Sequence, residues 1–337
     1  MENLRIGVVG TGAIGKKHIN RLMNELAGVT VVAVGDAYIE GAREVADKYG
    51  IRVEENCDDV IKASDVDAVV VTAWDPAHKE YVLKSIAAGK PVFCEKPLAP
   101  TAEGCKEIIE EEMKFGRRLV QVGFMRRYDK GYIQLKQAVE DDEIGAPLML
   151  HCTHRNPKPY PDSYDDDMMI TQVLIHEIDI IKWLVNDEYA EAYLLTGKNS
   201  SKVPNEHLHD PQMAIFKTKS GIIAEVEINM DAYFGYDIQC EIVGETGIVK
   251  LPDPYMISFK KDATAGRKIC YNWEDRFADT YSAELREWVE NTKKGIVAGP
   301  NSWDGYVAAA TAEAFIKSRK EGMPVKIDIE PRPEFYK

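Results

Sequence analysis

Hydrophobic and polar positions follow different patterns in the two parts of this chain. In the first part, short runs of consecutive apolar, β-branched residues alternate with stretches whose apolar residues recur at helical spacing. Unbroken apolar runs are typical of parallel strands that are covered on both faces. Strand–helix alternation therefore predicts a doubly wound α/β domain with a parallel sheet, a Rossmann fold, over residues 1–124. The expected strands are 4–9, 30–35, 67–73, 90–95 and 118–123, and the expected helices are 14–27, 40–50, 78–89 and 102–116.

Beyond residue 124 the pattern changes to strands with apolar residues at every second position. Such alternation predicts antiparallel strands that bury one face and leave the other exposed. We expect residues 125–337 to form an α+β domain with an open, mainly antiparallel sheet, whose free face is a candidate surface for oligomer formation. The helices expected here are 130–141, a helix around His176, 281–295 and 302–322.

Composition and charge narrow the class of protein. The 337 residues carry a formal net charge of −14, which argues against nucleic-acid and anionic-membrane partners because both need a basic surface. We expect no membrane span and no secretory signal, since no apolar run is long enough and the first strand begins almost at once. The six cysteines are scattered without a CxxC pair, which favours reduced thiols in the cytoplasm.

A glycine-rich segment, GTGAIG, follows the first expected strand and begins the first helix. In a βαβ unit, Gly10 allows the tight turn, Gly12 lets the backbone approach a pyrophosphate, and Gly15 lets helix and strand pack closely. The pyrophosphate lies at the positively polarised N-terminus of the helix, so Ala13 and Ile14 are also candidates for cofactor binding.

Asp36 ends the second expected strand, where an acid accepts hydrogen bonds from the adenine-ribose hydroxyls of a dinucleotide. An acid here also repels a 2′-phosphate, and the next residues, Ala37 and Tyr38, include no arginine to bind one. These residues favour NAD over NADP. The alternative is a structural glycine turn followed by a capping aspartate.

Candidate reacting groups follow the expected strand at 90–95. A doubly wound sheet binds its ligand beyond the carboxyl ends of its strands, so Glu95 and Lys96 of the CEKP segment are placed next to the cofactor. Lys96 can polarise a hydroxyl, or take its proton if burial and the nicotinamide cation lower its pKa. The bond to Pro97 is a candidate cis peptide. A surface lysine at a strand end is an equal alternative on spacing alone.

The helix around His176 has a polar stripe apart from its main apolar face. Gln172, His176, Asp179 and Trp183 fall on this stripe at regular α-helical spacing. The histidine is a candidate general base, although a core histidine satisfied by hydrogen bonds is the commoner explanation. A metal site is not expected, because no second histidine lies one turn away and no cysteine is near.

Six segments together resemble one known family over essentially the whole chain. They are GTGAIG with its aspartate, CEKP, GFMRRYD (123–129), HRNP (154–157), IHEID (175–179) and GYDIQCEIVGE (235–245). The family is that of glucose–fructose oxidoreductase and inositol dehydrogenase. The resemblance implies an NAD-dependent oxidoreductase that converts one ring hydroxyl of myo-inositol to the ketone, and a homotetramer built through the open sheet.

The resemblance also implies roles for individual residues. Lys96 would bind the reacting hydroxyl and relay its proton, and His176 would be the general acid/base, oriented by Gln172. The remaining positions would bind substrate hydroxyls (Arg126, His154, Asn156 and Tyr236) or the cofactor (Gly10, Gly12, Ala13, Ile14, Gly15, Asp36, Glu95 and Lys96).

Gln172 departs from the family pattern, which has aspartate one turn before the histidine. An aspartate stabilises the imidazolium as it forms, whereas a glutamine carbonyl orients the ring but supplies no charge. Three interpretations stay open: a slower or differently tuned dehydrogenase, another acid in the same role, or an inactive or altered-substrate paralogue. The altered substrate would be scyllo-inositol or a sugar such as glucose. The candidate acids are Asp179 and the loop residues Asp165, Asp166 and Asp167.

Overall fold

The chain consists of two compact units. The computed structural model describes residues 3–157, 163–201, 203, 206–253 and 255–337. Unit 1 comprises Met1–Phe124, Tyr281–Ala309 and Glu330–Lys337, and unit 2 comprises Met125–Thr280 and Ala310–Ile329. Two segments after residue 280, which the sequence pattern placed in the second domain, thus belong to the first unit.

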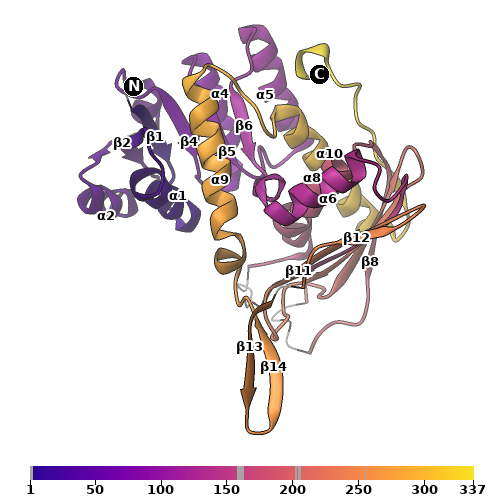
Figure 1. The fold of residues 1–337 in the computed structure, drawn as a ribbon. Helices are drawn as coiled ribbons and strands as arrows, with labels where there is room; N and C mark the ends of the chain where they lie inside the picture. The colour runs from indigo at the N-terminus through magenta and orange to yellow at the C-terminus, as the bar shows by residue number, and fades with distance from the viewer. Residues whose placement is uncertain (1–2, 158–162, 202, 204–205, 254) are drawn as a thin grey trace. The chain divides into compact units, whose positions relative to one another are not determined.

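Unit 1 contains a six-stranded parallel sheet in the order β3-β2-β1-β4-β5-β6 (Figure 1). This is the doubly wound strand order, so the predicted fold class is confirmed. The pattern missed β3 and α3, which are too short to show a period. The elements are β1 (Leu4–Val9), α1 (Ala13–Asn24), β2 (Val29–Gly35), α2 (Ile39–Tyr49), β3 (Arg52–Val53), α3 (Cys57–Lys62), β4 (Ala68–Val71), α4 (His78–Ala87), β5 (Val92–Glu95), α5 (Ala102–Phe115) and β6 (Val120–Gly123).

A hydrophobic core of unit 1 lies on one face of this sheet. Alternate residues of β1 enter it, together with apolar residues of α1 and α2 and of the later part of α9 (Trp273–Lys293). Trp288 of α9 packs edge-on against Phe93 of β5, with 5.7 Å between ring centres. A helix from late in the sequence therefore completes the domain that the first 124 residues begin.

Unit 2 contains a seven-stranded sheet in the order β12-β11-β7-β10-β9-β8-β15. Only the β7–β10 pair is parallel among its pairings within the described residues, as predicted for a mainly antiparallel sheet. The strands are β7 (Pro147–Arg155), β8 (Tyr189–Thr196), β9 (Gln212–Thr218), β10 (Ile223–Asn229), β11 (Asp237–Gly244), β12 (Ile248–Lys250) and β15 (Val325–Lys326); the longer helices are α6 (Lys130–Glu140), α8 (Ile175–Val185) and the end of α10 (Ser302–Glu321).

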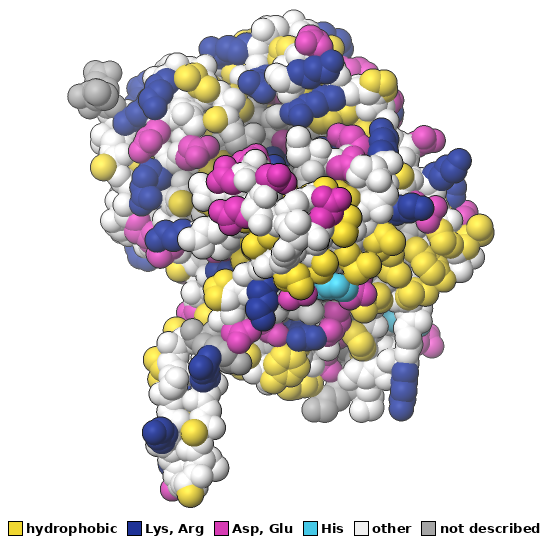
Figure 2. All heavy atoms as spheres, turned by 45° about the vertical axis from the view of Figure 1, so that its right-hand side comes forward, with side chains coloured by type: hydrophobic (Ala, Val, Ile, Leu, Met, Phe, Trp, Pro, Cys, Tyr) yellow, Lys and Arg dark blue, Asp and Glu magenta, His cyan; other side chains and the backbone are white. Residues whose placement is uncertain are grey.

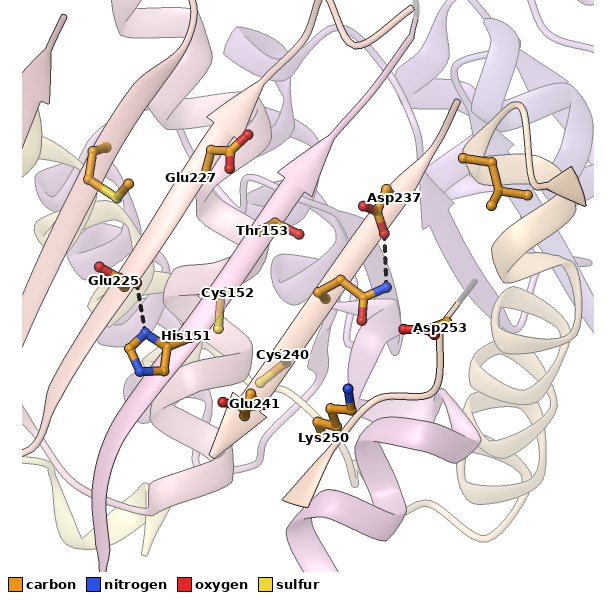
Figure 3. A pocket seen from close by; sticks show the side chains of 13 residues that line it. His151, Cys152, Thr153, Glu225, Glu227, Asp237, Cys240, Glu241, Lys250 and Asp253 are labelled. Carbon is orange, nitrogen blue, oxygen red and sulfur yellow. Dashed lines mark hydrogen bonds and ion pairs between the residues drawn. The ribbon is translucent and has the colours of Figure 1, made fainter. Parts of the chain in front are cut away.

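Helices cover one face of this second sheet and leave the other open. On the covered face, Phe216 of β9 packs against Phe315 of α10, and the hydroxyl of Tyr189 on β8 donates to the Ile178 carbonyl of α8. In β7, buried and partly exposed residues alternate. Figure 3 shows the open face, where acidic side chains of β10 and β11 lie beside His151 and Thr153 of β7.

A two-stranded hairpin, β13 (Tyr255–Lys261) and β14 (Thr264–Ile269), projects from unit 2 (Figure 1). No strand was expected here, because the sequence shows neither an apolar run nor clear alternation. Basic and hydrophobic side chains share its surface (Figure 2), and Met256, Ile257 and Phe259 are exposed.

The helix carrying His176 is not uniformly α-helical. A short turn, α7 (Asp166–Met168), leads into a π-helical segment, Met169–Leu174, and α8 begins at Ile175. The assumption of regular α-helical spacing from Gln172 to His176 is therefore wrong, because Gln172 lies in the π-helical part. Single π-helical turns within α-helices are rare and occur frequently at functional sites.

In the described part of the chain, no helix combines the length and the apolar character that crossing a bilayer requires.

Candidate active-site residues

The turn between β1 and α1 requires two of its glycines. Gly10 has a φ of +101°, and a Cβ there would lie 2.4 Å from the backbone nitrogen of Ala73. A Cβ on Gly15 would lie 2.2 Å from the carbonyl oxygen of Gly10. Gly12 is different, since no atom lies within 4 Å of the position of its Cβ. The outer side of the turn is thus open, as a loop that receives a phosphate requires.

A cavity of about 430 Å³ adjoins this turn, and its lining includes Gly12, Ala13 and Asp36. Asp36 is held in place by three donors: its carboxylate accepts from the backbone N–H and the hydroxyl of Thr11, and from the backbone N–H of Tyr38 at 2.8 Å. Lys16 pairs with Glu44 at the cavity wall. An open glycine turn, a helix N-terminus and an anchored acid beside one cavity fit a dinucleotide without a 2′-phosphate.

Lys96 follows the C-terminal end of β5, and its bond to Pro97 is cis, as predicted. The preceding Glu95 is 6% exposed. Its carboxylate binds Nε2 of His18 at 2.7 Å and accepts the backbone N–H of Lys96 at 3.2 Å. Both carboxylate oxygens of Glu95 thus already have partners within the protein. A direct contact between Glu95 and the cofactor stays a prediction.

A buried charged cluster in unit 2 joins η2 (Met125–Tyr128), α8 and β7. Arg126, which is 1% exposed, forms an ion pair with Glu177, and its Nη2 lies 3.1 Å from Nδ1 of His154. The same Nδ1 lies 3.0 Å from the second oxygen of Glu177. A carboxylate only accepts and a guanidinium only donates, so Glu177 favours a proton on Nδ1 of His154 while Arg126 favours a lone pair there.

Burial and charge act in opposite directions on this cluster. Burial alone would raise the pKa of the Glu177 carboxyl, but the charges of Arg126 and His154 outweigh burial and lower it. Burial alone would likewise lower the pKa of Arg126, but Glu177 raises it. Both groups are therefore charged in the folded protein. Arg126 holds Glu177 and His154 in place, and the direct substrate contact expected for it stays a prediction.

His176 and Tyr236 flank His154. The ring centre of His154 lies 6.3 Å from that of His176 and 6.2 Å from that of Tyr236. Burial raises the pKa of Tyr236 to about 12, so its hydroxyl keeps its proton at neutral pH and can donate a hydrogen bond. Three of the predicted substrate and catalytic residues thus lie together in unit 2.

The remaining predicted residues of unit 2 lie at the ends of two elements. Asn156 follows β7, where its backbone binds Asn229 and Ala232. Gln172 is half-buried in the π-helical segment that precedes His176.

The acids proposed to replace the family aspartate are bound elsewhere in unit 2. Asp179 forms a two-point ion pair with Arg127, and Asp166 binds Arg319 and His209. Asp167 also pairs with Arg319, and Asp165 accepts a backbone N–H of Met168. Each has a structural role of its own, which favours Gln172 itself as the neighbour of functional interest.

Sequence reasoning missed Glu177 and His18. His18 follows Lys16 and Lys17 on its helix, and Glu177 directly follows His176, so neither residue stands out as a single polar position in an apolar turn. Their partners lie far away in the sequence, so no local pattern identifies them.

Comparison with known proteins agrees with this geometry. Residues 4–124 match the model of an oxidoreductase family with an NAD-binding Rossmann fold, and residues 136–327 match the C-terminal alpha/beta domain of that family. The chain belongs to this oxidoreductase family. Its N-terminal domain is therefore an NAD-binding Rossmann fold, and the predicted family and cofactor are confirmed.

Individual relatives match over nearly the whole chain. Inositol 2-dehydrogenases of Klebsiella pneumoniae and Serratia proteamaculans are each 49% identical, with 99% of both chains covered. The structure of myo-inositol dehydrogenase from Lactobacillus casei, in complex with NAD(H) and myo-inositol, superposes with a TM-score of 0.97 at 38% identity. That alignment covers 99% of this chain and 100% of the other.

Proposed function

We propose that this oxidoreductase transfers a hydride from a ring hydroxyl carbon of myo-inositol to NAD and releases the keto-inositol. The observation that carries the proposal is the near-complete match to inositol 2-dehydrogenases at 49% identity. The clustering of His154, His176 and Tyr236 in unit 2 and the position of Lys96 after β5 support it.

The residues have separate tasks in the proposed reaction. NAD, held by the Gly10–Gly15 turn and Asp36, supplies the hydride acceptor. Lys96 binds the reacting hydroxyl and relays its proton, and His176 accepts that proton as the general base. Tyr236 donates to another hydroxyl, and His154 forms a hydrogen bond with one through Nε2. Asn156 adds an amide that both donates and accepts.

Gln172 supports the slower or differently tuned form of this reaction. Its side-chain carbonyl can accept a hydrogen bond from the imidazole of His176, which fixes the ring, but a neutral amide does not stabilise the imidazolium. The same residue favours a second candidate, a dehydrogenase of another cyclitol or of a sugar, including scyllo-inositol and glucose. A non-catalytic NAD-binding paralogue is the remaining alternative.

One assay separates these candidates. The protein is mixed with NAD and myo-inositol, and NADH absorbance is followed at several substrate concentrations. We expect kcat/KM to be highest for myo-inositol among inositol isomers and glucose. A higher kcat/KM for another polyol would identify that polyol, and not myo-inositol, as the preferred substrate. No turnover of any of these substrates with NAD or NADP would favour the non-catalytic paralogue.

We also propose that the protein is a homotetramer that works in the cytoplasm and needs no metal. Exposed apolar residues on the open sheet, including Met149 of β7 and Ile223 of β10, which pair with each other, support assembly through this face. The cysteines, all of them buried and outside any disulfide, suit a reducing compartment.

A further inference from the structure

His18 joins the helix of the glycine turn to β5, the strand that directly precedes Lys96. It lies on α1, is fully buried, and its Nε2 is 2.7 Å from Oε1 of Glu95. Its ring packs against Phe93 and Tyr281, each with 5.8 Å between ring centres. The histidine is therefore fixed by aromatic contacts as well as by the carboxylate.

Glu95 makes its second contact with the backbone of Lys96. Oε2 accepts that backbone N–H at 3.2 Å, while Oε1 is bound by His18. The neighbouring strand leaves room for this carboxylate, because a Cβ on Gly123 would lie 3.1 Å from its Cδ. Burial alone would raise the pKa of Glu95, but His18 and the nearby Lys96 lower it, so the side chain is a buried anion.

The residue after Lys96 is held as well. His78 at the start of α4 places Nδ1 2.7 Å from the carbonyl oxygen of Pro97 and Nε2 2.9 Å from that of Ala73. Both ends of the Lys96 segment are thus tied to helices that begin beside the carboxyl ends of the strands. A buried anion is costly to retain, and here it is placed next to a lysine with a proposed role in the reaction.

We propose that Glu95 and His18 are positioning residues for Lys96, an inference that rests on the proposed function of that lysine. Glu95 fixes the backbone at Lys96 and keeps a negative charge beside it. His18 holds Glu95 and joins it to α1, the helix that begins at the cofactor turn. Neither residue touches the substrate. The pair thereby links the helix at the cofactor-binding turn to Lys96, the group that we propose binds the reacting hydroxyl.

The sign of the charge effect can be tested. A carboxylate near an ammonium group favours its protonated form, and replacing it with a neutral amide removes that preference. Among the described residues, the charged groups beside the pair include Lys96 and Arg21, whose Nη1 lies 3.5 Å from Nδ1 of His18. The limb of the kcat profile that reports deprotonation of Lys96 should therefore move to lower pH by about one unit in Glu95→Gln, since an adjacent opposite charge typically shifts titration by one to three units.

The experiment compares steady-state kinetics and NAD binding in four variants of the full chain. For Glu95→Gln we expect kcat for myo-inositol to fall about 10- to 100-fold, the cost of a slightly misplaced group, with NAD affinity unchanged. His18→Leu should act in the same direction. His18→Gln keeps an N–H donor near the position of Nε2 and should restore much of the loss.

Glu112→Gln is the matched control. Glu112 is another buried acid of unit 1, but it binds the backbone N–H groups of Leu119 and Val120 at the opposite end of the strands, together with Ser302 and Tyr336. Its replacement should lower the melting temperature while kcat per folded molecule and its pH profile stay as in the parent protein.

Three outcomes contradict the inference in different ways. Parent-like kcat and pH profile in Glu95→Gln and His18→Leu would reduce the pair to a structural role. Weaker NAD binding with an unchanged pH profile would place Glu95 at the cofactor instead. If the parent protein itself does not turn over any polyol, the proposed function fails and this inference fails with it.

Discussion

At the scale of single residues, Gln172 offers the sharpest test of the proposed chemistry. Replacing it with aspartate restores the charge that the family pattern has four residues before the proposed general base, and we expect this charge to stabilise the imidazolium. We expect Gln172→Asp to raise kcat at least about tenfold, because an acid that orients such a histidine is worth orders of magnitude elsewhere. Gln172→Asn, with the same length as aspartate but no charge, is the control. An equal effect of both substitutions would refute the charge argument.

Glu177 is expected to matter first for stability. Glu177→Gln leaves the buried Arg126 without its counter-charge, so the free energy of unfolding should fall by about 3–5 kcal/mol. Replacing both partners with methionine should cost less than the single change. Urea titration measures these values, with Glu111→Gln on the exposed face of α5 as a control that changes stability by less than about 0.5 kcal/mol.

The pH dependence of stability follows from the same carboxylate. The pKa of Glu177 is lowered in the folded protein, so its contribution is complete above the unfolded value of about 4.3 and disappears as the pH falls through the folded value. Glu177→Gln should therefore show a smaller loss of stability between about pH 5 and pH 3. A parallel decline in parent and variant would contradict the assigned direction.

At the scale of elements, the sequence predicted the strands and helices that have a regular hydrophobic pattern and missed elements that are short or irregular. Continuous apolar runs identified β1, β2, β4, β5 and β6, because parallel strands are buried on both faces. The two-residue β3 has no period to detect, and the hairpin β13–β14 is exposed on both sides. The π-helical turn before α8 is a change in hydrogen-bond register, which side-chain pattern alone does not reveal.

The candidate site shows the same division. Residues in short motifs, such as the glycine turn and Lys96, were located from their place after a strand. The contacts of Arg126, Glu177 and His154 come from three elements, so only the folded chain shows that Arg126 is buried among charged partners.

We expect the segment from β2 to α2 to control the choice between NAD and NADP. The cavity beside the glycine turn is lined by three acids, Asp36, Glu40 and Glu44. Its lysine, Lys16, forms an ion pair with Glu44. Asp36→Ser should raise the ratio of kcat/KM for NADP to that for NAD at least about tenfold, because it removes the acid that repels a 2′-phosphate. Asp47→Ser, on the exposed side of α2, should leave the ratio unchanged. A ratio that does not respond to Asp36→Ser would place nucleotide selection elsewhere.

At the scale of the whole molecule, the open face of the second sheet should decide the assembly state. Met149 and Ile223 are cross-strand neighbours with 37% and 40% exposure, and an apolar pair of this kind is stabilised by a partner surface. Light scattering should give four times the chain mass of 37.9 kDa. Met149→Glu introduces a charge that a dry interface does not tolerate, so the variant should elute as dimers or monomers. Met113→Glu changes a methionine of 45% exposure on α5 and should leave the tetramer intact. A tetramer that survives Met149→Glu and dissociates with Met113→Glu would move the interface from the open sheet to α5.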